Sequence, residues 1–271
     1  MKLRVEHRTV YRYEPAVRLV VQTLRLRPSE FDGQRVLEWR IDAGGHCVDD
    51  GYVDGAGNCI HMLTAHGPVE ILELVSTGVV EVADRAGMLR GLREVLHPLA
   101  WLRAGPRTAP APAIEAFARA AMAGIGTDRL EQGHALAAAV ADAVRYTAGT
   151  SDAGTSAAEA LEAGTGVCQD HAHVLVAAAR SLGIPARYVT GYLNPGSDII
   201  GAEATHAWAE LHLGAYGWIG FDPANRQCPT ADYVRLACGI DAVDAAPVRG
   251  TALGRAREVL DVEVHVRLAQ Q

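Results

Sequence analysis

The stretch Ala163-Gly164-Thr165-Gly166-Val167-Cys168-Gln169-Asp170-His171-Ala172-His173 decides the fold of this chain. Its glycines predict a loop that other backbone can approach closely. The residues that follow, 173–182, are apolar and alanine-rich, which predicts a buried helix. Cys168 is therefore expected at or near a helix N-terminus. There the helix dipole stabilises a thiolate, and free backbone N–H groups can stabilise an oxyanion.

A cysteine in this position is more often an inert core residue than a nucleophile, so the interpretation depends on a base elsewhere. The segment 205–211, THAWAEL, follows an expected loop over residues 194–204 and places His206 at the start of an alternating strand. The segment 217–225, GWIGFDPAN, places Asp222 at the end of another strand, where Pro223 stops it.

An antiparallel hairpin of these two strands brings His206 and Asp222 to the same edge of a sheet. Cys168, His206 and Asp222 then have the residue types of a nucleophile, a base and a carboxylate that orients the base. We expect these three residues to be catalytic.

Four segments in this order resemble the bacterial transglutaminase-like cysteine proteinase family. They are GVCQDHAH (166–173), GIPARYVTGY (183–192), THAWAE (205–210) and GWIGFDP (217–223). The resemblance is dense over residues 155–250, and the first hundred residues also resemble the N-terminal domain of that family. It implies that the family's triad falls on Cys168, His206 and Asp222, and that the core is papain-like.

The expected fold class is α+β: a papain/transglutaminase-like core, in which the helix carrying the cysteine packs on an antiparallel sheet, after a β-sandwich-like N-terminal domain. Short alternating segments, among them separate strands expected at 69–75 and 78–82, and turn signals mark residues 1–104 as the β-rich domain. The proline-rich residues 105–112 are interpreted as a linker, and residues 113–271 as the catalytic domain. Within the latter, helices are expected over 112–123 and 130–146. The alternating strand 259–268 is a candidate to pack with the N-terminal domain.

Two histidine and cysteine groups invite a metal interpretation, which we rank low. Asp170 and His173 share a helical face while His171 points elsewhere, and no second cluster has zinc spacing. His46-Cys47 and Cys59-x-His61 flank one hairpin, where ordinary cross-strand neighbours explain them equally well. Cys228 and Cys238 are interpreted as spare thiols in a loop-like region. We expect neither a metal nor a cofactor.

The composition argues against two classes of binding partner, nucleic acids and membranes. A net charge of −7 without a basic run argues against nucleic acid, and no apolar stretch approaches the length of a membrane span. The first residues, MKLRVEHRTVYRY, lack the apolar core of a signal peptide, so a cytoplasmic location is the default expectation. Homo-oligomerisation stays open.

The expected activity is hydrolysis of a peptide or protein amide through a thioester acyl-enzyme. Two alternatives stay open: transfer of a glutamine acyl group to an amine, and peptide binding without turnover on the same fold. Lys2 is the sole lysine, which is compatible with acyl transfer to amines but does not argue for it.

Overall fold

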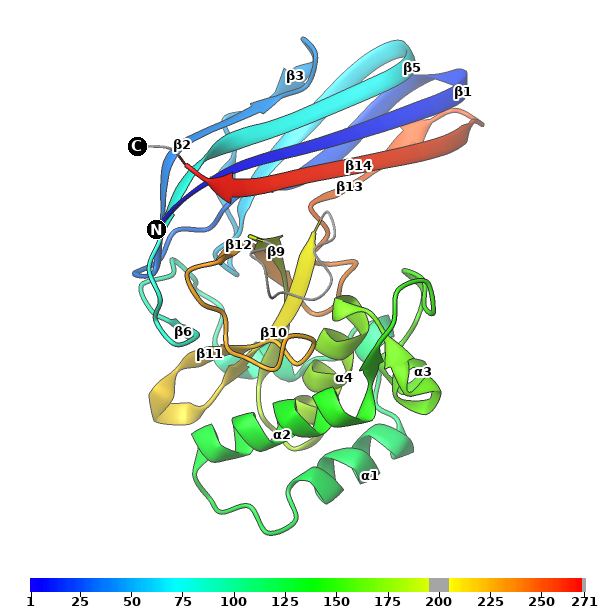
Figure 1. Ribbon diagram of the computed structural model, residues 1–271. Helices are drawn as coiled ribbons and strands as arrows, with labels where there is room; N and C mark the ends of the chain where they lie inside the picture. Colours follow the sequence, from blue (N-terminus) through cyan, green and yellow to red (C-terminus); the bar gives the residue numbers. More distant parts are fainter. Residues whose placement is uncertain (195–204, 270–271) are drawn as a thin grey trace.

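The computed structural model describes residues 1–194 and 205–269. Figure 1 shows three layers: a large β-sheet, a smaller β-sheet beneath it, and a group of helices beneath the smaller sheet. These layers confirm the α+β class. Within the described ranges, no helix is both long and apolar enough to cross a bilayer. The loop expected over residues 194–204 falls almost wholly outside these ranges.

The large sheet is built on two long antiparallel strands, β1 (Lys2–Arg27) and β5 (Cys59–Val82). The remaining strands of this sheet are β2 (Gln34–Asp42), β3 (Cys47–Val48), β4 (Tyr52–Val53), β13 (Val248–Leu253) and β14 (Arg257–Leu268). Burial alternates along much of β1, as a strand with one face on a core requires. Residues from both halves of β1, among them Tyr11 and Leu24, share one buried cluster, so the sheet closes over its own core.

The last strand of the chain lies beside the first. β14 pairs with β1 from Leu3↔Leu268 to Glu14↔Arg257, and β13 pairs with the second half of β1. The C-terminal strands therefore complete the N-terminal sheet, as Figure 1 shows.

Several strands are longer than the sequence pattern predicts. The expected separate strands at 69–75 and 78–82 are parts of β5, which runs through Gly78. A Cβ on Gly78 would lie 2.2 Å from the Glu38 carbonyl oxygen and 2.4 Å from the Trp39 ring. Gly78 therefore does not end a strand. It lets the backbone of β2, which pairs with β5 here, approach closely.

The smaller sheet has the strand order β12-β9-β10-β11-β6. Its strands are β12 (Tyr233–Gly239), β9 (Ala186–Leu193), β10 (His206–His212), β11 (Trp218–Phe221) and β6 (Met88–Leu89). Helix α4 (Cys168–Ser181) packs on β9 and β10, and its residues are buried almost all round. Three further helices surround α4: α1 (Pro112–Ala121), α2 (Arg129–Ala143) and α3 (Ala157–Ala163).

The second predicted helix, 130–146, is too long at its C-terminal end. Helix α2 stops because Val144 adopts extended backbone angles, and β7 (Arg145–Tyr146) then pairs in parallel with β8 (Thr165–Gly166). The tertiary pairing beside the Cys168 loop overrides the helical periodicity.

The proline-rich segment 105–112 is packed rather than free. It contains a short 3₁₀ turn, Pro106–Thr108, and a second such turn, Pro98–Leu102, precedes it. Thr108 is buried, and its Oγ1 accepts a hydrogen bond of 2.8 Å from Arg180 of α4.

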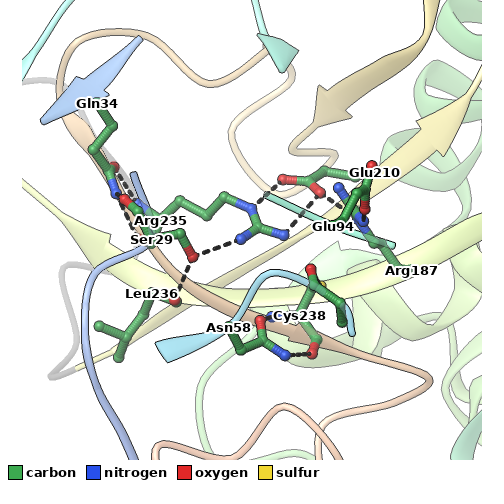
Figure 2. Close-up of polar contacts among 10 residues, drawn as sticks. Ser29, Gln34, Asn58, Glu94, Arg187, Glu210, Arg235, Leu236 and Cys238 are labelled. Atoms are coloured by element: carbon green, nitrogen blue, oxygen red, sulfur yellow. Dashed lines mark hydrogen bonds and ion pairs between the residues drawn. The ribbon is translucent and has the colours of Figure 1, made fainter. Parts of the chain in front are cut away.

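Two side-chain amides fasten the large sheet to the free edge of the small one. Gln34 exchanges two hydrogen bonds of 2.7 Å with the backbone N–H and C=O of Arg235. Asn58 does the same with Cys238, at 2.8 and 3.0 Å. Figure 2 shows both amides lying along β12. Because β12 is an edge strand, these amides satisfy backbone groups that a further strand would otherwise pair.

A buried charge network joins three strands of the small sheet, β9, β10 and β12 (Figure 2). Glu210 accepts from Arg187 Nε at 2.6 Å and from Arg235 Nε at 2.8 Å, and Arg187 also reaches Glu94 at 2.5 Å. The Arg187 guanidinium lies 4.0 Å from the centre of the Trp218 ring. Burial raises the pKa of Glu210, but Arg235 and Arg187 more than offset this, so its pKa is lowered and the carboxylate stays charged.

Candidate active site

Cys168 is the first residue of α4, preceded by Val167 as the N-cap. Its side chain is 8% exposed and belongs to the core formed by the helices and the inner face of the small sheet. The sulfur therefore lies at the positive end of a buried helix, as the sequence predicts.

Asp170 ties the start of α4 to the neighbouring loop. Its Oδ2 accepts hydrogen bonds from the Val167 N–H at 2.8 Å and from the Ser151 hydroxyl at 2.5 Å. A Cβ on Gly166 would lie 2.6 Å from this side chain, so the glycine makes room for it. The backbone on either side of Cys168 is thereby fixed.

His206 and Asp222 form a buried hydrogen bond. His206 Nε2 lies 2.6 Å from Asp222 Oδ2, and the side chains are 1% and 0% exposed. The β10–β11 hairpin produces this contact: Ala209 pairs with Phe221, which leaves His206 and Asp222 at the same end of the two strands. The sequence-predicted arrangement of these two residues is present.

The electrostatics favour a charged imidazole. Burial lowers the pKa of His206, but the hydrogen bonds to Asp222 and Cys168 and the charges of both groups outweigh it, and the pKa rises to about 10. Burial raises the pKa of Asp222, yet the bond to His206 outweighs it and the pKa is lowered. The pair is thus an imidazolium held by a carboxylate.

The other ring nitrogen of His206 remains for the thiol. Nδ1 is buried and has no hydrogen bond of standard geometry within the described residues, the Cys168 sulfur included. Cys168 lies close enough to raise the imidazole pKa, and Nδ1 is the ring nitrogen that Asp222 leaves open to it. The structure brings all three sequence-predicted residues together, in the order thiol, imidazole, carboxylate.

Two residues that sequence reasoning did not assign to the site hold Asp222. The Tyr233 hydroxyl donates to Oδ2 at 2.7 Å, and the Asn225 amide donates to the same oxygen at 2.8 Å. The contact of Asn225 with Asp222 gives Asn225 a position in the site.

Sequence analysis did not assign Tyr233 to the site because the strand that carries it was not predicted. Residues 228–238 were expected to be loop-like, whereas Cys238 lies at 2% exposure in β12 and not in a loop. The available signal was the alternation of Val234, Leu236 and Cys238, and the charge of Arg235 between them suggests an exposed face, whereas Arg235 is buried. That charge is compensated by Glu210 from another strand, which no local pattern reveals.

Aromatic rings line the imidazole on the side away from α4. Trp208 stacks on His206 with ring centres 6.3 Å apart, and Tyr233 meets Trp208 edge-on at 5.5 Å. Gly191 allows this packing, since a Cβ there would lie 2.5 Å from the Trp208 ring and 2.2 Å from the Val234 carbonyl oxygen.

The two tyrosines of β9 have different surroundings. Tyr188 packs against His173 with ring centres 5.0 Å apart. Burial, followed by the charge of Cys168, raises the pKa of Tyr188 well above its usual value, so it remains a neutral hydroxyl close to the thiol. Tyr192 instead lies 2.9 Å from His7 Nδ1 in the contact with the large sheet.

The two histidines of α4 that were weighed as metal ligands make ordinary hydrogen bonds. His171 Nδ1 and Nε2 lie 2.8 and 2.7 Å from the carbonyl oxygens of Val167 and Val144, and His173 Nε2 accepts from the Ala242 N–H. Across residues 1–194 and 205–269, no three histidine, cysteine or acidic side chains gather as a metal site would require. The side chains present instead suit thiol chemistry.

Comparison with known proteins identifies two matching family regions and full-length relatives. The "Transglutaminase-like superfamily" matches residues 115–223, and the "Bacterial transglutaminase-like N-terminal region" matches residues 3–81. The uncharacterized protein ML0607 of Mycobacterium leprae is 30% identical over 99% of both chains. The uncharacterized protein Rv2569c of Mycobacterium tuberculosis is 30% identical over 98% of this chain and 92% of its own length.

A solved structure has the same fold along the whole chain. It is the crystal structure of "a Putative Cysteine Protease from Cytophaga hutchinsonii", which covers 100% of this chain and 92% of its own, with a TM-score of 0.74 and 22% identity. Together with the matched segments and the full-length relatives, it leads to one conclusion. The chain belongs to the transglutaminase-like superfamily and carries the N-terminal region of its bacterial members.

Proposed function

We propose that this chain is a cysteine hydrolase that cleaves peptide or amide bonds through Cys168, His206 and Asp222. The observation that carries the proposal is the buried 2.6 Å contact between His206 and Asp222, with the second ring nitrogen left for Cys168. A buried imidazolium beside a thiol at a helix N-terminus stabilises the thiolate, which is the nucleophilic form.

In the first half-reaction, the Cys168 thiolate attacks the carbonyl carbon and a C–S bond forms. Negative charge collects on the carbonyl oxygen, and backbone N–H groups at the start of α4 are suitable donors to it. The C–N bond then breaks, and His206 gives its Nδ1 proton to the departing amine. A thioester and a neutral imidazole result.

In the second half-reaction, a water molecule attacks the thioester and His206 takes its proton. The C–S bond breaks, the carboxylic acid leaves and the thiolate–imidazolium pair is restored. Asp222 keeps its charge throughout and stabilises the imidazolium each time that it forms.

The test is cleavage of a mixed peptide library in H₂¹⁸O, read by mass spectrometry. The wild-type protein is expected to release new carboxyl termini that carry one ¹⁸O, and Cys168→Ala is expected to release none. Cys47→Ser is the matched control, because Cys47 is an exposed thiol in the large sheet. Cleavage that survives in Cys168→Ala contradicts the proposal.

A primary amine added to the same reaction separates the two enzymatic outcomes. Hydrolysis gives ¹⁸O-labelled acids, whereas transamidation gives amide adducts of the added amine. If intact-protein mass spectra show no acyl adduct on Cys168 and no product of either kind appears, the hydrolase proposal fails.

A further inference from the structure

A cavity of about 620 Å³ lies at the junction of the two sheets, away from Cys168. Its walls come from β1, from the hairpin loop around Asn58, from the 3₁₀ turn Pro98–Leu102 and from the end of β12. The volume is within the range of small-molecule sites in proteins. Figure 2 shows two of its wall residues, Asn58 and Cys238, bonded to each other.

The cavity is on the face of the small sheet that α4 does not cover. Its wall residues Trp101 and Cys238 share a buried cluster with Val189, whereas Tyr188, the preceding residue of β9, packs with Cys168 and α4. Successive residues of a strand point to opposite faces, so the sheet separates the cavity from the candidate active site.

Unpaired hydrogen-bond donors line this cavity. Nε and Nη1 of Arg25 are buried, and neither has a partner in the part of the chain that the structure describes. The same holds for Nε1 of Trp101, whose side chain is only 4% exposed. Buried donors are almost always paired in proteins, and an unpaired guanidinium is especially costly.

The acidic residues of the wall do not neutralise Arg25. Both carboxylate oxygens of Asp54 accept hydrogen bonds within its own turn. The donors are the N–H groups of Ala56 and Asn58 and the side-chain amide of Asn58. Asp244 accepts from the Ile240 N–H, and neither carboxylate forms an ion pair with Arg25 within the described residues. The Arg25 guanidinium, which is partly exposed, therefore has no acidic partner among the described residues and is open to an external one.

Two exposed leucines add apolar surface to the cavity. Leu96 and Leu99 are 42% and 61% exposed, and both contribute to the wall. Exposed leucines beside buried donors suit a ligand with an anionic head and an apolar body.

We propose that this cavity binds a small organic anion, with its carboxylate or phosphate head on Arg25 and Trp101 and its apolar body against Leu96 and Leu99. The site is independent of the amide chemistry of Cys168, so it stands or falls separately from the proposed hydrolase function.

The test uses ¹⁹F NMR titrations of the full chain with three probes. These are 4-fluorophenylacetate, 4-fluorophenyl phosphate and the uncharged 2-(4-fluorophenyl)ethanol, none of which contains an amide that the enzyme could cleave. At least one anion is expected to bind saturably with a Kd of about 1 mM or tighter, and the alcohol at least about 10-fold more weakly. The tighter anion identifies the preferred head group.

Arg25→Gln is expected to weaken binding of the anion by about 10-fold or more, because it removes the charge. Arg27→Gln, on the same strand, is the matched control: Arg27 lies near Glu30 rather than in the cavity, and binding should be unchanged. Cys168→Ala should also bind normally.

Thermal melts supply a second readout. The unliganded Arg25→Gln variant is expected to melt at or above the wild-type temperature, since it loses an uncompensated charge, and the anion should raise Tm only in the wild type. The proposal is overturned if neither anion saturates up to about 20 mM, if the alcohol binds as well as the anions, or if Arg25→Gln binds as the wild type does.

Discussion

Three hydrogen bonds converge on one oxygen atom of Asp222. One carboxylate oxygen, Oδ2, receives hydrogen bonds from His206, Tyr233 and Asn225. These donors keep the pKa of the buried carboxyl low despite the burial that raises it. Tyr233 is a positioning residue in this scheme, because it acts on the substrate only through Asp222 and His206.

Tyr233→Phe removes one of these donors while it preserves the ring that packs on Trp208. We expect kcat/KM to fall by about 10-fold, since a hydrogen bond to a charged group is worth about 1.5 kcal/mol or more. Asp222 should also titrate at higher pH, so the acid limb of the pH–rate profile should move upward. The measurement is kcat/KM against pH.

A second tyrosine–carboxylate pair provides the control for this change. The Tyr216 hydroxyl donates to Asp128 at 3.0 Å on the exposed surface, in the turn at the end of the β10–β11 hairpin opposite to His206 and Asp222. Tyr216→Phe should leave the profile unchanged. An unshifted acid limb in Tyr233→Phe, or an equal shift in Tyr216→Phe, would contradict the role given to Tyr233.

At the scale of elements, the β9–β10–β12 region determines where the imidazole lies. His206 pairs with Gly191 of β9, which in turn pairs with Arg235 of β12. The absence of a side chain at residue 191 lets the Trp208 ring and the β12 backbone approach each other.

Gly191→Ala is expected to destabilise the protein by about 1–3 kcal/mol, because the new methyl group collides with backbone and a packed ring. Urea unfolding measures the loss. Gly126→Ala is the control, since Gly126 is exposed and a Cβ there would meet only the Glu131 carboxylate end at 3.1 Å. Equal stabilities of the two variants would refute the packing argument.

The elements also show where the sequence was informative. Residues near each other along the chain gave the nucleophile helix, the β10–β11 hairpin and the order of the three candidate catalytic residues. The end of α2 and the whole of β12 were missed, because both depend on partners distant in sequence: β8 for the first, and Gln34, Asn58 and Glu210 for the second. Periodicity within a segment carries no signal of such partners.

At the scale of the whole molecule, the charge network centred on Glu210 joins the layers. Arg187 and Arg235 of the small sheet converge on it, and Arg235 also donates to Ser29, which follows β1. A buried ion pair is weak evidence for net stability. Removing one partner, however, leaves the remaining buried charges without a counter-charge, which is destabilising.

Glu210→Gln should therefore lower the free energy of unfolding at neutral pH by about 3–5 kcal/mol. The folded-state pKa of Glu210 is below its ordinary value of 4.5, so its stabilisation is present above that pH and is lost as the pH falls through the folded-state pKa. The difference from wild type should shrink in acid. Urea titrations at several pH values test this.

Asp142→Asn is the control for the network, because it breaks an ion pair with Arg226 whose side chains are 59% and 72% exposed. Its effect should stay within about 0.5 kcal/mol at every pH. If Glu210→Gln is as mild as this control, the network does not hold the layers together.

The central claim is that Cys168 and His206 form a thiolate–imidazolium pair, and the alkylation rate of Cys168 by iodoacetamide against pH tests it most directly. With the His206 pKa raised to about 10, the imidazolium persists through neutral pH, so Cys168 should react nearly as fast at pH 6 as at pH 8. His206→Ala should lose the low-pH reactivity, while exposed Cys47 follows the steep rise of an ordinary thiol in both proteins. If Cys168 tracks Cys47, or is inert in both proteins, the pair does not form and the account of this site is wrong.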